Sequence, residues 1–151
     1  MTTTRQGVTL AELSVFVPGW AKTKGSMDFR PNGTAKQSVV GSATWAKLMA
    51  SVMRRAWDGR PPLTGPLYFA ATYVLNGDPV AVRAGDGDKL ERNVWDALQG
   101  CGSKCPAKGC GKHAGVIADD VQFVQWCGTK RRSAGVDDPI GVHVMLGTWV
   151  G

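Results

Sequence analysis

The chain has 151 residues, 43% of them hydrophobic and 20% charged, a composition that is typical of a globular domain and excludes global disorder. Eighteen lysines and arginines against 12 acidic residues give a formal net charge of +6, which favours a polyanionic partner. No apolar run approaches the length that crosses a bilayer, and the first residues contain no apolar signal segment. We therefore expect one cytoplasmic domain, in which grouped cysteines bind metal more often than they form disulfides.

The first half of the chain predicts a strand, a hairpin and a helix. The strand covers residues 13–17 and is closed by Pro18 and Gly19. The turn signal Asn32-Gly33 then predicts a hairpin within residues 27–40. A helix follows, capped by Ser42 or Thr44. Spacing of i, i+3 and i+4 predicts its buried face, which consists of Trp45, Leu48, Met49, Val52, Met53 and Trp57.

The second half predicts three strands and one helix. Residues 67–75 are apolar on both faces, as in a central strand. A helix over 88–98, a strand over 121–126 and a last strand over 142–150 follow, with Cys127 in the core. The predicted buried residues of this half are Val94, Trp95 and Leu98 in the helix and Val142, Val144 and Leu146 in the last strand. The order of elements predicts a single α+β domain, in which a mixed β-sheet carries two main helices.

Two acidic clusters stand out in this basic chain. Asp86 and Asp88 have i, i+2 spacing before the second helix, and Asp119 and Asp120 open the strand that follows it. In an extended segment, i, i+2 spacing places both side chains on one side. Grouped carboxylates repel one another, and Mg²⁺ relieves this repulsion because it binds a few carboxylate oxygens and keeps waters for substrate phosphates. The alternatives are a helix cap at Asp88 and a solvated turn at Asp119 and Asp120.

The order of these motifs carries a family resemblance. The segments are Asp86-Gly-Asp88-Lys-Leu-Glu-Arg92, then Asp96-Ala-Leu98, then Asp119-Asp120-Val-Gln122. Together with the opening Val15-Phe-Val-Pro-Gly19 and the later Lys24-Gly25, they resemble the RusA-type Holliday junction resolvases. The resemblance implies a RusA-like fold and a homodimeric, Mg²⁺-dependent endonuclease of phage or bacterial type. Such an enzyme cuts four-way DNA junctions by paired symmetrical nicks.

The resemblance also implies roles for individual residues. The metal-binding aspartates of the family correspond to Asp86, Asp88 and Asp120, with Asp119 adjacent, and its active-site lysine corresponds to Arg92. This chain departs from the pattern because Arg92 replaces lysine and Lys89 replaces the usual asparagine. Arginine keeps the positive charge but does not give up a proton. Either cation can take the role, and Arg92 is favoured because it lies one helical turn from Asp88.

A cysteine-rich segment separates the two acidic clusters. Cys101, Cys105, Cys110 and His113 form a Cys₃His set that predicts a structural Zn²⁺ site. The alternative is a loop with reduced thiols. Lys104, Lys108 and Lys112 interleave with these residues and are candidates for contacts with the DNA backbone.

Further basic residues complete the candidate DNA surface, and the alternative is an ordinary charged surface. They are Lys22, Lys24, Arg30, Lys89, Lys130, Arg131 and Arg132, the last three placed between the final two strands. Trp20 is the tryptophan we expect to stack on an opened base. Two other functions remain open: a non-catalytic DNA-binding protein, and a metal-dependent nuclease for other branched or flap DNA.

Overall fold

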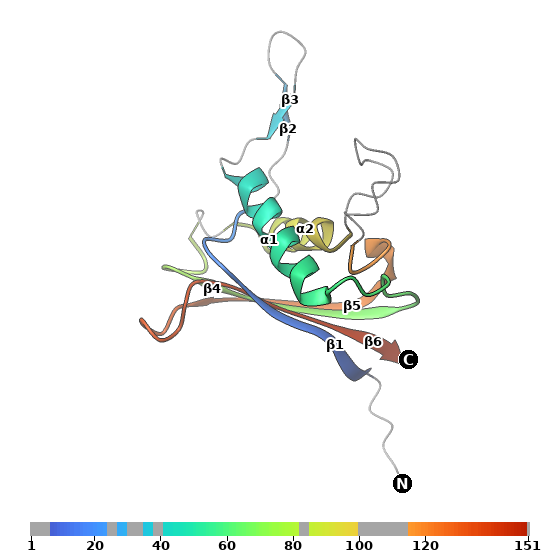
Figure 1. Cartoon of the computed structure of the whole chain (residues 1–151). Coiled ribbons are helices and arrows are strands. Elements are labelled where there is room, and N and C mark those ends of the chain that lie inside the picture. Colours follow the sequence, from blue (N-terminus) through green and yellow to red (C-terminus); the bar gives the residue numbers. More distant parts are fainter. Residues whose placement is uncertain are drawn as a thin grey trace.

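The computed structural model describes residues 7–23, 27–29, 35–37, 41–81, 85–99 and 115–150. These residues form a mixed four-stranded sheet with two helices on one of its faces, which confirms the predicted α+β architecture (Figure 1). The strands in sheet order are β1 (Gly7–Pro18), β6 (Gly141–Val150), β4 (Leu67–Leu75) and β5 (Phe123–Arg132). β4 runs parallel to β5, and β6 runs antiparallel to both of its neighbours. The predicted hairpin is also present, as the antiparallel pair β2 (Met27–Phe29) and β3 (Ala35–Gln37).

Helix α1 (Ser42–Trp57) covers part of the sheet with the predicted apolar face. Trp45, Met49, Met53 and Trp57 are buried, and Val52 is half-buried. The prediction for Leu48 is wrong, since its side chain is 40% exposed. At about 100° per residue, Leu48 lies roughly 100° around the helix from the middle of the buried face.

The cap of α1 also differs from the prediction. The N-cap is Gly41 at a φ of 82°, with no side-chain capping bond, and not Ser42 or Thr44. The first intrahelical bond runs from the Trp45 N–H to the Gly41 carbonyl at 2.9 Å. A left-handed φ favours glycine. The helix therefore begins after a glycine in this conformation, without a capping bond from a side-chain hydroxyl.

β4 is a central strand, as predicted, because it pairs with β5 on one side and with β6 on the other. Phe69, Ala71 and Tyr73 are buried in alternation. On the neighbouring β6, all three alternating residues predicted to be buried (Val142, Val144 and Leu146) lie in the core.

β5 departs most from the prediction. It begins at Phe123 and not at Val121, because a short 3₁₀ helix, η3 (Asp120–Gln122), occupies the preceding residues. It then extends to Arg132, so the basic residues 130–132 lie within the strand and not after it. Cys127 is exposed, contrary to the prediction of a core position. Among the described strands β5 has only β4 as a neighbour, so it is the edge of the sheet and buries less than a central strand would.

Helix α2 (Gly87–Gln99) positions the candidate site. Leu90, Val94 and Leu98 face the core, and Trp95 is half-buried. The Asn93 amide donates to the Lys22 carbonyl at 2.9 Å, which ties the helix to the segment after β1. α2 begins one residue earlier than predicted, so Asp88 lies inside its first turn and is not the cap.

Candidate functional site

The exposed face of α2 carries a row of charged residues. Asp88, Arg92 and Asp96 are all exposed and follow one another at i, i+4 spacing. Residues with this spacing are neighbours on one helical face. The row places one cation between two carboxylates, one turn from each.

Two carboxylates and two amines meet at the amino-terminal end of α2. Asp86 is largely exposed, and the Nζ of Lys89 lies 3.5 Å from its Oδ2. The Nζ of Lys130, from the edge strand β5, donates to the Gly85 carbonyl at 3.0 Å. Asp88 lies in the first turn of the helix. The chain turns here at Gly85, which has a φ of 83°. A side chain at this position would collide with the side chain of Thr23, so only glycine fits.

Asp119 and Gln122 hold η3 together in a capping box. The Asp119 carboxylate accepts from the Val121 N–H at 3.1 Å, and the Gln122 side-chain oxygen accepts from the Asp119 N–H at 3.1 Å. The Gln122 amide also donates to the carbonyls of Leu63 and Gly65. Asp119 and Gln122 therefore have a structural role, since their side chains satisfy backbone N–H groups at the start of η3.

Asp120 lies at the other end of α2. Burial raises the pKa of its carboxyl, as do a hydrogen bond with Asp119 and the charges of Asp119 and Asp96. A hydrogen bond from Gln99 opposes this rise in pKa. The Asp120 carboxylate is therefore crowded by negative charge, and a proton or a cation relieves the crowding.

The structure does not bring the two acidic clusters together. Asp96, the neighbour of Asp120, lies eight residues after Asp88 on the helix, a separation of about 12 Å at 1.5 Å per residue. Within the described ranges, no three His, Cys, Asp or Glu side chains are placed to hold a metal ion together. The acidic residues thus form two pairs along the helix, Asp86 with Asp88 at its start and Asp96 with Asp120 at its end.

Each pair has the chemistry to hold Mg²⁺. This ion is commonly bound by one or two carboxylates and completes its shell with water and substrate phosphates. The helix distinguishes the two ends, because its amino-terminal N–H groups attract phosphate whereas its carboxy-terminal end attracts cations. The amino-terminal pair also has Lys89 and Lys130 beside it. A phosphate and a carboxylate-bound ion can therefore meet there.

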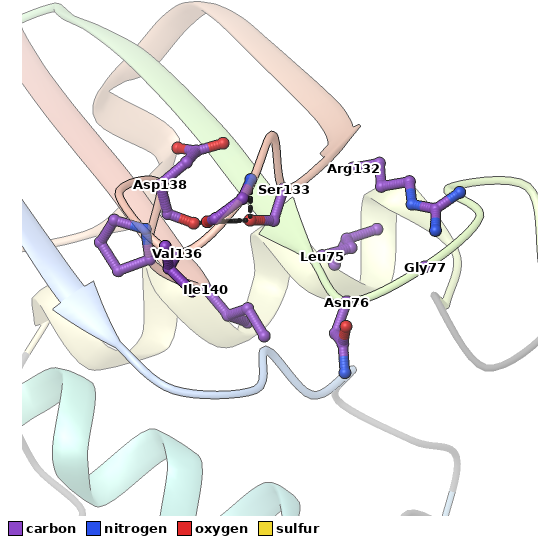
Figure 2. Close-up of a pocket in the computed structure, with 10 residues that line it drawn as sticks. Leu75, Asn76, Gly77, Arg132, Ser133, Val136, Asp138 and Ile140 are labelled. Atoms are coloured by element: carbon purple, nitrogen blue, oxygen red, sulfur yellow. Dashed lines mark hydrogen bonds between the residues drawn. The ribbon is translucent and has the colours of Figure 1, made fainter.

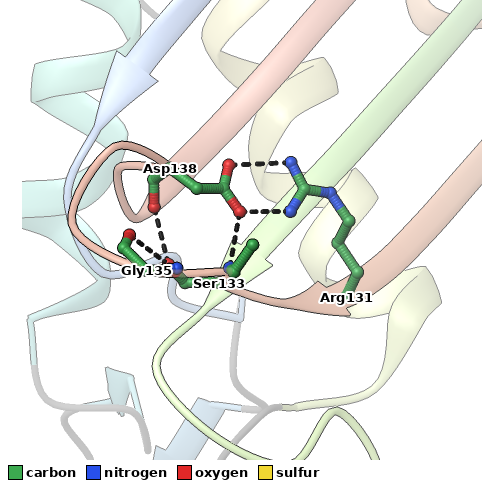
Figure 3. A network of polar contacts seen from close by, with 5 residues as sticks. Arg131, Ser133, Gly135 and Asp138 are labelled. Carbon is green, nitrogen blue, oxygen red and sulfur yellow. Dashed lines mark hydrogen bonds and ion pairs between the residues drawn. The ribbon is translucent and has the colours of Figure 1, made fainter.

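Three consecutive basic residues of β5 have different partners. Lys130 bonds the backbone beside Asp86, as described above. Arg131 forms a bidentate pair with Asp138, at 2.5 and 2.9 Å, and Asp138 also accepts from the Ala134 N–H (Figure 3). These bonds lower the pKa of Asp138 to about 2. Arg131 is thus engaged in shaping the β5–β6 turn, which makes it the weakest of the three candidates for DNA contact.

Arg132 points away from Asp138 (Figure 2). It lines a cavity of about 470 Å³ whose other lining residues come from the end of β4 and from the β5–β6 turn: Leu75, Asn76, Gly77, Ser133, Gly135, Val136, Asp138, Pro139 and Ile140 (Figure 2). Trp20 and Lys22 lie in the segment that follows β1, and the Lys22 Nζ is 5.2 Å from the centre of the Trp20 ring. Trp20 is 48% exposed. The expected DNA residues that are described thus lie on several elements and not on one strand.

The remaining predicted residues lie outside the described part of the chain. They comprise the zinc set Cys101, Cys105, Cys110 and His113, the interleaved Lys104, Lys108 and Lys112, and the two basic residues Lys24 and Arg30.

Sequence reasoning missed the contribution of two acidic residues on α2. Asp96 faces Asp120, and its i+8 spacing from Asp88 was the available signal. Glu91 is only 7% exposed, and burial together with the charge of Asp88 raises the pKa of its carboxyl. No pattern in the sequence marks Glu91, because its burial depends on a glycine of β5, Gly128, whose bare backbone leaves room for the carboxylate.

Comparison with known proteins adds no relative to this description. No protein-family model matches the chain, and no curated protein matches it either. No helix in the described ranges is long and apolar enough to cross a membrane. The resemblance to RusA-type resolvases therefore rests on the motifs quoted above.

Proposed function

We propose that this protein is a Mg²⁺-dependent endonuclease that cuts branched DNA, with the four-way junction as its substrate. The observation that carries the proposal is the amino-terminal end of α2. There two exposed carboxylates, Asp86 and Asp88, lie beside Lys89 and Lys130 at the start of a 13-residue helix. This arrangement suits a phosphodiester with an accompanying cation.

Asp86 and Asp88 would hold the ion, which supplies an activated water and neutralises charge on the phosphate when bound. Lys130 and the first N–H groups of α2 would bind a phosphate oxygen and orient the DNA backbone. Arg92, one turn further, would balance the negative charge that develops during displacement, because a guanidinium keeps its charge. In this proposal Asp120 is not a ligand of that ion, because its acidic neighbours are Asp119 and Asp96.

The test is a substrate panel. Purified protein is incubated with Mg²⁺ or with EDTA on a mobile four-way junction, a flap and a linear duplex. The proposal predicts symmetrical nicks in the junction that require the metal, with binding that weakens steeply as salt rises. Equal cutting of the flap would shift the assignment to a general nuclease for branched DNA.

A second candidate is non-catalytic DNA binding. The capping role of Asp119 favours it, because that carboxylate serves the start of η3. Junction binding without cutting, in Mg²⁺ and in Mn²⁺, would select this function and contradict the first.

Two further features belong to the proposal. The cysteine-rich segment binds structural zinc, so protein purified with its cysteines reduced carries close to one equivalent; less than about half an equivalent would argue against the site. The protein is a homodimer, since symmetrical cutting of two strands needs two active sites. Sedimentation of the free protein tests the second point, and a monomer that still cuts both strands would contradict it.

A further inference from the structure

A cavity of about 460 Å³ opens beside the amino-terminal end of α2. Its lining comes from β4, α2 and β5 and consists of Tyr73, Gly87, Glu91, Trp126, Cys127, Gly128 and Lys130. This size is in the range of pockets that hold small organic groups. Gly87 and Lys130 are shared with the surroundings of Asp86 and Asp88, so the cavity adjoins the proposed phosphate position.

Two buried polar side chains line the cavity. Tyr73 is 1% exposed, and its hydroxyl has no hydrogen-bond partner among the described residues. Glu91 is also buried and lies against the backbone of Gly128. A buried hydroxyl without a partner reduces stability, so its retention calls for a group that bonds it at some stage of function.

An aromatic ring accompanies these polar groups. Trp126 is 53% exposed. The centre of its ring lies 5.6 Å from that of Trp95 on α2, and the two rings are nearly perpendicular. Exposed aromatic rings are the surfaces on which single-stranded bases stack. Trp20, the residue expected to stack from the sequence, does not line this cavity, and Lys22 already lies over its ring.

We infer that the cavity receives one unstacked nucleobase of the DNA, stacked on Trp126 and bonded at its edge by Tyr73 and Glu91. The phosphate of the same nucleotide then lies near Lys130 and the start of α2. The inference rests on the proposed function and deepens it, because it names the structural element of DNA that is recognised. At a branch point stacking is already interrupted, so extracting a base there costs less than it does in a duplex.

The first test is an abasic scan. Four-way junctions carry one abasic nucleotide at each position around the crossover in turn, and affinity is measured with Ca²⁺ in place of Mg²⁺. At one position, removal of the base should lower the affinity of the wild type about fivefold or more, which is the loss expected for one stacked base. At the same position, removal of the base should have little effect on the affinity of Trp126→Leu. Trp126→Phe keeps a ring at the same position and should behave like the wild type.

The second test uses Tyr73→Phe, which removes one hydroxyl and leaves the ring in place. Loss of an unpaired buried hydroxyl should leave thermal stability equal or higher, while junction affinity falls about twofold to tenfold. Unchanged affinity would show that Tyr73 only fills the core and would contradict the inference. This variant also keeps the inference testable if Trp126→Leu does not fold.

Different results would overturn the base-binding cavity and the proposed function. A protein that cuts junctions but shows the same abasic effects with and without Trp126 overturns the base-binding cavity alone. A protein that binds no branched DNA overturns the proposed function, and the cavity assignment falls with it.

Discussion

The two ends of α2 carry the same residue type in different circumstances. At the amino-terminal end, Asp86 is exposed and has Lys89 3.5 Å away, with Lys130 bonded to the adjacent backbone. At the carboxy-terminal end, Asp119 is committed to the cap of η3, and Asp120 is crowded by its acidic neighbours. Two neighbouring aspartates in a sequence can therefore have a structural role, as Asp119 does when it caps η3, and need not both bind a metal ion. The end with nearby amines is the better candidate for a phosphodiester.

The largest expected effect distinguishes the two ends directly. Asp88→Asn should lower the single-turnover rate of junction cutting by about 100-fold or more. The variant would lose the bound ion, which would stabilise the transition state by several kcal/mol. Junction affinity should stay the same or rise, since one repulsive charge is removed. Asp120→Asn should cost about tenfold or less by the same measure. An equal loss in both variants would show that the two ends act on one ion, as the family resemblance implies.

Asp119→Asn supplies the matched control for that experiment. Asparagine is as good a helix cap as aspartate, so η3 should remain intact while one charge disappears. Cutting close to the wild-type rate would support a structural role for Asp119. A loss as large as that of Asp88→Asn would return Asp119 to the metal site.

Arg92 lies between the two ends, and its replacement sharpens the comparison further. Arg92→Gln should slow cutting about tenfold or more, because the charge next to the reacting phosphate is removed. Arg92→Lys should retain most of the rate if only charge is needed, and it should alter the pH profile if the residue transfers protons. Arg55→Gln, an exposed arginine of α1, is the control. Full activity of Arg92→Gln would exclude Arg92 from the site.

Much of the fold follows from patterns that the sequence displays. Trp45, Met49 and Met53 show helical spacing, and Val142 and Val144 alternate, so α1 and β6 were predictable. These elements bury one face each, and their patterns therefore report their surroundings.

The wrong prediction for Cys127 has a tertiary cause. Cys127 was placed in the core because cysteine is often buried, but β5 is the edge of the sheet, and edge position depends on pairing that a strand does not encode. The roles of Asp119 and Glu91 likewise depend on Gln122 and Gly128, which only the fold places beside them. Local pattern therefore gave the candidate aspartates, while their grouping required the tertiary structure.

Gly128 should control the position of α2. A methyl group at this position would collide with the Glu91 carboxylate, and because Glu91 is buried its side chain must repack, so Gly128→Ala should lower the free energy of unfolding by about 1 kcal/mol. Urea unfolding measures the change. Gly87→Ala is the control, because nothing lies within 4 Å of the added group, and its effect should be smaller. Equal stability of both variants would contradict the packing of Glu91 on β5.

The smallest effect concerns Asp138, on the β5–β6 turn. Its folded pKa of about 2 lies below the value of about 3.9 for an unfolded aspartate, so its contribution to stability is present above pH 4 and is lost toward pH 2. Asp138→Asn should therefore lower the melting temperature slightly at pH 7, and the difference should vanish near pH 2. A difference that persists at pH 2 would mean that the Arg131 pair is not its source.

The most direct test of the account locates the bound ion. Fe²⁺ replaces Mg²⁺ in the complex with a junction, ascorbate and peroxide are added, and the positions of local backbone cleavage in the protein are mapped by mass spectrometry. With Asp86 and Asp88 as ligands of the ion, we expect cleavage around residues 85–89, at the amino-terminal end of α2. Cleavage confined to the surroundings of Asp96 and Asp120 would contradict it.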